Sequence, residues 1–108
     1  MTESIQVQRS SGNVFADLGL ENSDELLVQA ELAHTISRII TQQKMTQAEA
    51  AEILGVDQPK ISALMNGKLS GFSIVRLFRF LNTLGQDVEI MVKTKPKSRP
   101  KAQTRVLN

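Results

Sequence analysis

The run from Thr46 to Lys68, TQAEAAEILGVDQPKISALMNGK, limits the possible fold of this chain more than any other segment. Its spacing predicts two short helices that cross at a glycine, which is the helix-turn-helix arrangement. Thr46 and Glu49 stand three residues apart, so each side chain can bond the backbone of the other in a capping box that starts the first helix. Gly55 can end that helix in the left-handed conformation without a Cβ penalty. We therefore expect a sharp turn between the two helices.

The apolar residues of the first helix form a narrow stripe that includes Ala50, Ala51 and Leu54. The two alanines are small, as is needed where a second helix approaches closely. Val56 follows the glycine and is expected to return the chain to the core. We therefore expect the second helix to cross the first at Ala51.

The second helix is expected to begin with Asp57 as its N-cap and with Pro59 in the first turn, where a missing N–H costs little. Ile61 and Leu64 then point inward. The outward face is left with small or hydrogen-bonding side chains that fit a DNA major groove: Gln58, Lys60, Ser62, Ala63 and Asn66. This pattern favours double-stranded DNA as the partner. The alternative is an ordinary helical hairpin whose polar face meets only water.

The composition narrows the class of protein. A chain of 108 residues predicts one domain with one core. The absence of cysteine excludes a thiolate metal site and a thiol nucleophile, and the chain needs no oxidising compartment. No apolar run approaches the roughly 20 residues of a membrane span, and the polar start MTESIQVQRSS is unlike a secretory signal. We expect a cytoplasmic protein without a membrane partner.

Catalysis finds little support in the sequence. His34 is the single histidine and is expected on the surface, nearly opposite the apolar stripe of its helix. No glycine-rich phosphate loop and no metal-ligand spacing is present, and Glu49 and Glu52 have the spacing of a solvated helix face. We therefore expect no enzyme, no metal and no cofactor.

Charge divides the chain unevenly, although the formal net charge is only +2. Residues 1–92 carry seven Lys and Arg against eleven Asp and Glu, whereas residues 93–108 carry six bases and no acid. Such a tail can dock on phosphates with a salt-dependent affinity, and it can equally be a solvated segment without function. Its two prolines and low apolar content predict disorder in the free chain.

Three segments organise the chain. We expect an arm or loop over residues 1–23, a helix-turn-helix domain over residues 24–93, and the basic tail over residues 94–108. Ser23 is expected to cap a long scaffold helix that runs through Gln43 and buries Leu32, Ile36, Ile39 and Ile40. Ser73 is expected to cap a last helix, closed by Gly85, whose buried face consists of Ile74, Leu77, Phe78, Leu81 and Leu84.

Two features point to contacts with a second molecule. Phe80 lies at the edge of the apolar face of the last helix, where core packing and a second contact surface explain it equally well. Residues 86–93, QDVEIMVK, alternate as a strand does, with Val88, Ile90 and Val92 on one face. A lone strand leaves its backbone unpaired, so it needs a partner near Ile5, in a second copy or in another protein. We favour antiparallel pairing in a two-fold dimer, which would present two recognition helices to successive half-sites.

With these residues, the sequence resembles the helix-turn-helix domains of the phage-repressor class, the Xre and Cro type family, over about residues 30–85. That resemblance implies a mainly α, lambda-repressor-like bundle of four or five helices around the motif. A wider resemblance, over about residues 13–93, is to the small Xre-type proteins that serve as antitoxins beside a RelE- or HigB-like ribonuclease toxin. The segments that carry it are NVFADLG, TQAEAAEILGV, QPKISALMNGK, FSIVRL and LGQDVEI.

The resemblance implies a homodimer that binds its own operator, represses its operon and holds the toxin inactive. In the family, DNA is contacted by the start of the first motif helix and by the outward face of the second. This assigns Gln47 to a phosphate or base edge and Asn66 and Lys68 to the DNA backbone. The full contact set is Gln47, Gln58, Pro59, Lys60, Ser62, Ala63, Asn66 and Lys68.

One departure from the family pattern concerns base reading. Ala63 stands where a longer polar side chain would read more, and no arginine lies on this helix to bind guanine bidentately. Specificity is then expected from Gln58 with adenine, from Lys60 with guanine, and from DNA shape.

Two other functions are compatible with the same residues. A stand-alone or phage-type regulator would bind DNA without a toxin. A protein-inhibitor module would mask a partner and use the motif only as a scaffold. Residues 46–68 carry two lysines against three acids, which mildly favours the inhibitor.

Overall fold

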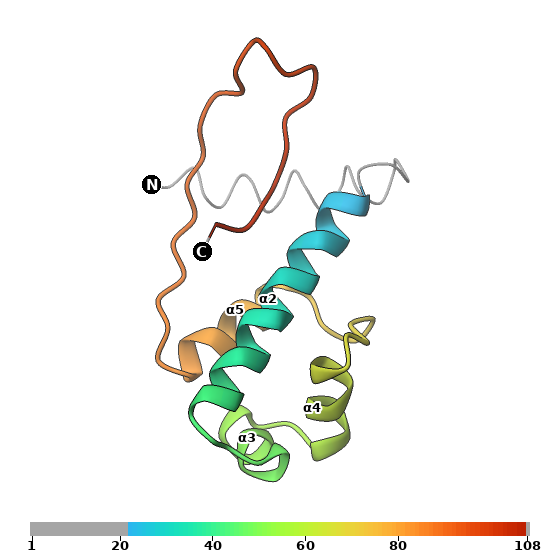
Figure 1. Ribbon diagram of the computed structural model, residues 1–108, viewed down its shortest axis with the longest axis vertical. Coiled ribbons are helices and arrows are strands. Elements are labelled where there is room, and N and C mark those ends of the chain that lie inside the picture. Colours follow the sequence, from blue (N-terminus) through green and yellow to red (C-terminus); the bar gives the residue numbers. More distant parts are fainter. Residues whose placement is uncertain (1–21, 108) are drawn as a thin grey trace. The chain divides into compact units, whose positions relative to one another are not determined.

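The computed structural model describes residues 22–107, so residues 1–21 of the arm that is expected over residues 1–23, and the last residue, lie outside the described residues. The described part contains four helices: α2 (Asn22–Gln42), α3 (Gln47–Leu54), α4 (Gln58–Met65) and α5 (Ile74–Thr83) (Figure 1). The prediction of a mainly α fold is confirmed for this part of the chain. Residues 29–88 make one compact unit, and residues 22–28 together with residues 89–107 belong to another.

The unit of residues 29–88 is built on apolar side chains from all four helices. The largest fully buried ones are Ile36, Ile40, Ile61, Leu64 and Leu77. Ala50 and Ala51 of α3 are also buried, and α3 packs on both α4 and α5. The stripe predicted for the scaffold helix is confirmed, because its four residues are all buried: Leu32, Ile36, Ile39 and Ile40. That helix ends at Gln42, one residue before the predicted end, but it begins at Asn22, so Ser23 lies in its first turn and is not the N-cap that the sequence predicts.

All four described helices end in the same way. Lys44 has a left-handed φ of 59° after α2, and its N–H donates to the carbonyl oxygen of Thr41 at 3.0 Å, while that of Met45 donates to Ile40 at 3.1 Å. This pair of bonds is the Schellman motif, which satisfies carbonyl groups that the helix leaves unpaired. The same pair recurs after the other three helices, where the left-handed residue is a glycine: Gly55, Gly67 and Gly85. Lys44 is therefore the one strained helix end among residues 22–107.

Phe80 is 5% exposed, so the structure places it in the core and not on a second contact surface. Its ring meets that of Phe72 edge to face, with the centroids 6.1 Å apart. Phe78, which the apolar stripe placed on the buried face, is only half-buried. Phe72 precedes α5, and its contact with Phe80 adds to the burial of the helix on that side.

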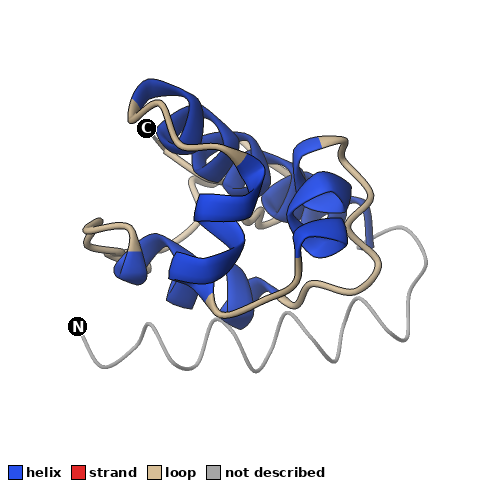
Figure 2. Cartoon of the chain, turned by 90° about the horizontal axis from the view of Figure 1, so that it is seen from below, coloured by secondary structure: helices blue, strands red, loops and turns tan. Residues whose placement is uncertain are grey.

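The expected strand over residues 86–93 is not formed within the described part of the chain, where loops join the helices and no strand is seen (Figure 2). A strand requires a hydrogen-bonded neighbour, and residues 22–107 supply none. Val88 and Ile90 are half-buried, whereas Met91 is 77% and Val92 45% exposed. In a single chain, the burial of these side chains therefore follows the alternation of apolar residues in the sequence only in part.

The basic tail makes hydrogen bonds of its own, although its composition predicts disorder. A turn joins the N–H of Arg99 to the carbonyl oxygen of Pro96 at 3.2 Å. Further along, the N–H of Thr104 donates to Oδ2 of Asp24 at 3.2 Å.

Among residues 22–107, no helix is both long and apolar enough to cross a bilayer.

Lys44→Gly is expected to stabilise the protein, because glycine adopts the left-handed conformation without the steric cost that lysine bears there. The gain in free energy of unfolding should be about 0.5–1 kcal/mol, since glycine also loses more backbone entropy on folding. Urea denaturation measures it. Lys44→Ala is the matched control, because it removes the same charge and keeps the strain. An equal gain in both variants would show that the charge, and not the backbone, is responsible.

Candidate nucleic-acid interface

The start of α3 is fixed by a reciprocal pair of hydrogen bonds. The N–H of Glu49 donates to Oγ1 of Thr46 at 3.0 Å, and the N–H of Thr46 donates to Oε1 of Glu49 at 2.8 Å. The predicted capping box is therefore confirmed. It places Gln47 in the first turn of α3, where its side chain is half-buried.

The rotation of α4 about its own axis is set by two buried residues. Ile61 is 0% and Leu64 is 1% exposed, as the sequence predicts. The helix begins where Asp57 caps it, with Oδ1 accepting the N–H of Lys60 at 3.2 Å, and Pro59 stands in the first turn. Because those two side chains point into the core, the opposite side of α4 meets solvent. We call this side the recognition face; it comprises Gln58, Pro59, Ser62, Ala63 and Asn66.

The recognition face carries uncharged side chains, which are short except for Gln58. Gln58, Pro59 and Asn66 are exposed, while Ser62 and Ala63 are half-buried. The amide nitrogen of Asn66 lies 3.4 Å from the hydroxyl of Ser62, within hydrogen-bond distance. Gln58 is therefore the long side chain of this face that reaches solvent with both a donor and an acceptor.

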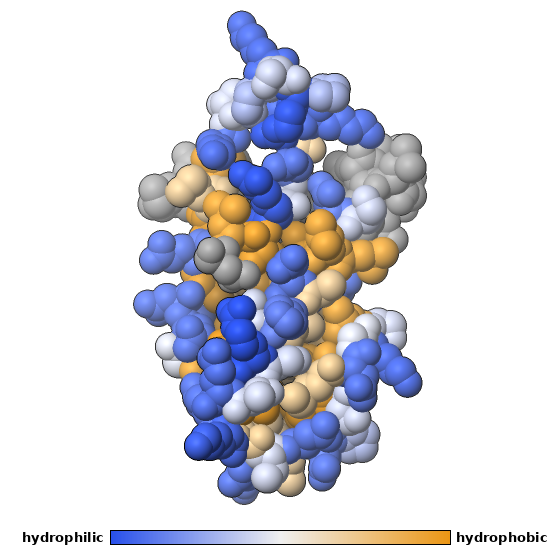
Figure 3. All heavy atoms as spheres, viewed as in Figure 1, coloured by the Kyte–Doolittle hydropathy of each residue, from blue (hydrophilic) through white to orange (hydrophobic). Residues whose placement is uncertain are grey.

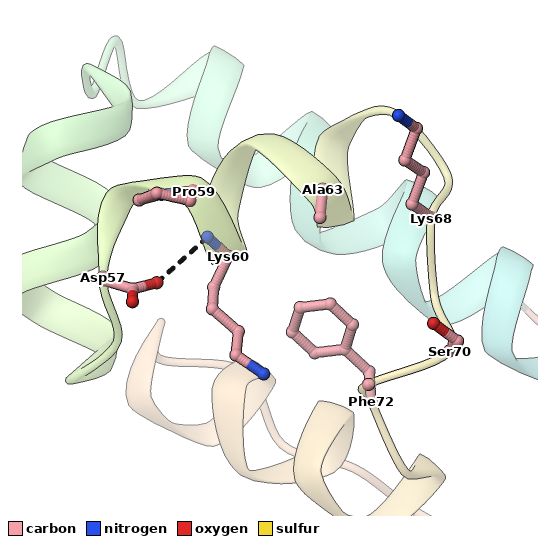
Figure 4. A pocket seen from close by; sticks show the side chains of 8 residues that line it. Asp57, Pro59, Lys60, Ala63, Lys68, Ser70 and Phe72 are labelled. Carbon is pink, nitrogen blue, oxygen red and sulfur yellow. Dashed lines mark hydrogen bonds between the residues drawn. The ribbon is translucent and has the colours of Figure 1, made fainter.

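Lys60 does not extend outward with the recognition face. It is half-buried, and its Nζ lies 5.5 Å from the centroid of the Phe72 ring (Figure 4). Its Nζ is also close to the loop, because a Cβ atom added at Gly71 would lie 3.4 Å from this Nζ. The lysine stem covers the loop while its charge is attracted to the ring face, a common arrangement for long cationic side chains. In this conformation Lys60 lies over Phe72 and is not extended toward a guanine.

Arg76 is a residue of the site that the sequence reasoning missed. Its guanidinium carbon lies 5.6 Å from the ring centroids of both Phe72 and Phe80. Its Nη1 is 3.4 Å from the carbonyl oxygen of Gly71, and its N–H donates to Oγ of Ser73, the N-cap of α5. The signal for this residue is the spacing of four between Arg76 and Phe80, because residues at that spacing are neighbours on one helix face.

A hollow of about 380 Å³ lies between α4 and the loop that leads to α5. Figure 4 shows its lining, with the stem of Lys60 and the ring of Phe72 side by side. It brings together four residues of the predicted contact set, namely Pro59, Lys60, Ala63 and Lys68, while Gln47 stands apart on α3. The remaining lining residues are Asp57, Ser70, Gly71 and Phe72.

Two of the three acids of the motif have structural roles, which explains part of its low positive charge. Glu49 and Asp57 both accept backbone N–H groups at helix starts, where a negative charge also favours the helix dipole. Glu52 is exposed on α3. In the described part of the chain, no group of three or more His, Cys, Asp or Glu side chains is placed to hold a metal.

Comparison with known proteins gives two matches to this chain. Residues 14–93 match a family described as a helix-turn-helix domain. A solved structure described as an XRE family transcriptional regulator is 44% identical and has a TM-score of 0.77. That match covers 81% of this chain and 98% of the other. No curated protein matches.

Lys60→Met is expected to destabilise the protein modestly, because methionine keeps an apolar stem over the loop but loses the charge above Phe72. The loss should be about 0.5–1 kcal/mol in free energy of unfolding, the usual value of an exposed cation–π contact. Lys68→Met is the matched control, since Lys68 is exposed and has no ring beneath it. Chemical denaturation compares the two. An equal effect in both variants would mean that the Phe72 contact contributes nothing.

Proposed function

We propose that this chain, which belongs to the XRE family of helix-turn-helix transcriptional regulators, is a sequence-specific repressor that binds its operator as a dimer. The observation that carries the proposal is the recognition face of α4. Both ends of the helix are capped and two core residues fix its rotation, so its outer side chains are held rigidly. Rigid presentation of short polar groups suits a major groove, where a helix must approach base edges closely.

Within the recognition face, Gln58 is the residue that we assign to base reading. Its amide can donate and accept at once, which fits the N6 and N7 edge of adenine. Ser62 and Ala63 are short enough to let the helix approach closely, and Ala63 can contact a thymine methyl group. Asn66 and Lys68 are assigned to the phosphate backbone, and Gln47 to a phosphate or base edge at the start of α3. DNA shape supplies the remaining specificity.

The position of Lys60 on the helix first indicates a guanine contact. We assign this lysine a different role. Its charge lies over Phe72, together with that of Arg76. From there it raises the positive potential beside the groove and favours phosphate approach, while base reading rests on Gln58.

For the dimer, we assign the contact to residues 86–93 of two copies in antiparallel register. Val92 and Met91 are exposed, and the segment has no partner strand within residues 22–107. Pairing with a second copy would satisfy the backbone groups and cover the apolar side chains Val88, Ile90 and Val92. The buried Phe80 has no part in this contact.

The finer proposal is that the protein is the antitoxin of a two-gene module and holds a RelE- or HigB-like toxin inactive. It rests on the segments NVFADLG and LGQDVEI, which resemble segments of the small Xre-type antitoxins. Co-purification with the product of the neighbouring gene separates the alternatives. A complex together with DNA binding supports the antitoxin, DNA binding alone supports a stand-alone regulator, and a complex without DNA binding supports a protein inhibitor.

Gln58→Ala is expected to weaken binding to the DNA upstream of the protein's own gene, because the variant loses a bidentate base contact. The expected loss is about 1–3 kcal/mol, with melting nearly unchanged. A gel-shift titration measures the affinity. Gln42→Ala, an exposed glutamine at the end of α2 and outside both the motif and the tail, is the matched control. If both variants bind as the wild type does, Gln58 is not at the interface.

Ile90→Pro is expected to convert the dimer to a monomer, because proline removes the N–H that edge pairing needs. Ile90→Thr keeps both the N–H and the branched shape and serves as the control. Light scattering gives the mass of each variant. A proline variant that remains a dimer would place the contact in another part of the chain.

A further inference from the structure

The tail concentrates positive charge more than any other part of the described chain. Residues 93–107 contain six Lys and Arg and no acid. Figure 3 shows hydrophilic side chains gathered over the tail at the top of the view. By contrast, the helix-turn-helix run carries two lysines against three acids, and Lys60 lies over Phe72. Most of the charge available for phosphate contact therefore lies outside the motif.

Two of the tail cations hold the tail in shape. Nζ of Lys95 donates to the carbonyl oxygen of Arg99 at 2.7 Å and to that of Pro96 at 3.2 Å. Nη1 of Arg99 donates to the carbonyl oxygen of Lys101 at 3.1 Å. Both side chains are half-buried. Lys95 and Arg99 thus stabilise the turn, and their donors are engaged by the backbone.

Three other cations of the tail point to solvent. Lys93, Lys97 and Arg105 are exposed, and within residues 22–107 they make no hydrogen bond or ion pair. Lys93 precedes the turn that Lys95 and Arg99 stabilise, and Lys97 lies within that turn. The positions of these charges are therefore constrained, while the charges themselves remain available.

The far end of the tail is tied to the first turn of α2. Oδ2 of Asp24 accepts the backbone N–H of Thr104 at 3.2 Å. The carboxylate takes a main-chain donor, so this bond closes the tail into a loop without occupying a tail cation. We call residues 93–105 the basic loop. Closure lowers the entropy that the loop would lose on binding.

We propose that the basic loop is a second DNA-binding element that contacts phosphates of duplex DNA without regard to sequence. This inference rests on the proposed function, since it assumes DNA as the ligand. Lys and Arg contacts to phosphates release counterions and supply affinity that carries no base information. The recognition face then selects the site, and the basic loop supplies much of the affinity that the nearly neutral motif lacks.

The test compares two double variants with equal charge loss. Lys93→Gln with Lys97→Gln removes two solvent-facing charges of the basic loop. Arg38→Gln with Arg79→Gln removes two exposed charges from α2 and α5 and is the control. Binding is titrated with salt on a duplex of the upstream DNA and on an unrelated duplex of equal length. The tail pair should make the slope of log K against log salt shallower by about 1.8, or about 0.9 for each lost phosphate contact.

The loss should be equal on both duplexes, so the preference for the upstream DNA should stay at its wild-type value. An unchanged slope in the tail pair, or an equal change in the control pair, would overturn the proposal. An unchanged slope would also favour an acidic protein, instead of DNA, as the partner of the tail. If the wild type shows no preference for the upstream DNA, the proposed repressor function fails, while the slope on the unrelated duplex still tests the basic loop.

Discussion

The burial of Ile61 and Leu64 is the constraint on which the rest of the site depends. These two side chains are almost fully removed from solvent, which fixes the rotation of α4 and hence the residues that meet a ligand. The small Ala50 and Ala51 of α3 lie buried in the same core and leave room for α4 to pack closely. A change at any of these positions would alter the recognition face without touching a residue of that face.

A second level of organisation surrounds Phe72. Lys60 of α4 and Arg76 of α5 both place their charges over this ring, and Arg76 also contacts Phe80. Gln29 of α2 donates to the carbonyl oxygen of Phe72 at 2.7 Å. Three helices thus meet at one loop residue. The loop after α4 is held in place by these contacts, and the hollow beside it acquires a positive rim.

Local features and the buried stripes of the helices could be predicted from the sequence, whereas contacts between side chains of different elements could not. The capping box of Thr46 and Glu49 and the left-handed Gly55 depend on neighbouring residues only, and both predictions are confirmed. The direction of Lys60 depends on Phe72, which is distant in sequence, so helix phase alone pointed it outward. Likewise, the sequence pattern places Phe80 at the edge of the apolar stripe of its helix, whereas in the structure Phe72 covers it. The strand over residues 86–93 requires a partner that one chain does not supply, and its pairing stays a prediction.

The central claim is that the recognition face of α4 reads DNA while cations beside it and in the tail supply affinity. NMR chemical-shift mapping with a duplex of the upstream DNA tests this claim most directly. We expect the largest sequence-dependent shifts at Gln58, Ser62 and Ala63, whereas the tail should shift equally with an unrelated duplex. Shifts confined to the tail with both duplexes, and none on α4, would contradict the claim.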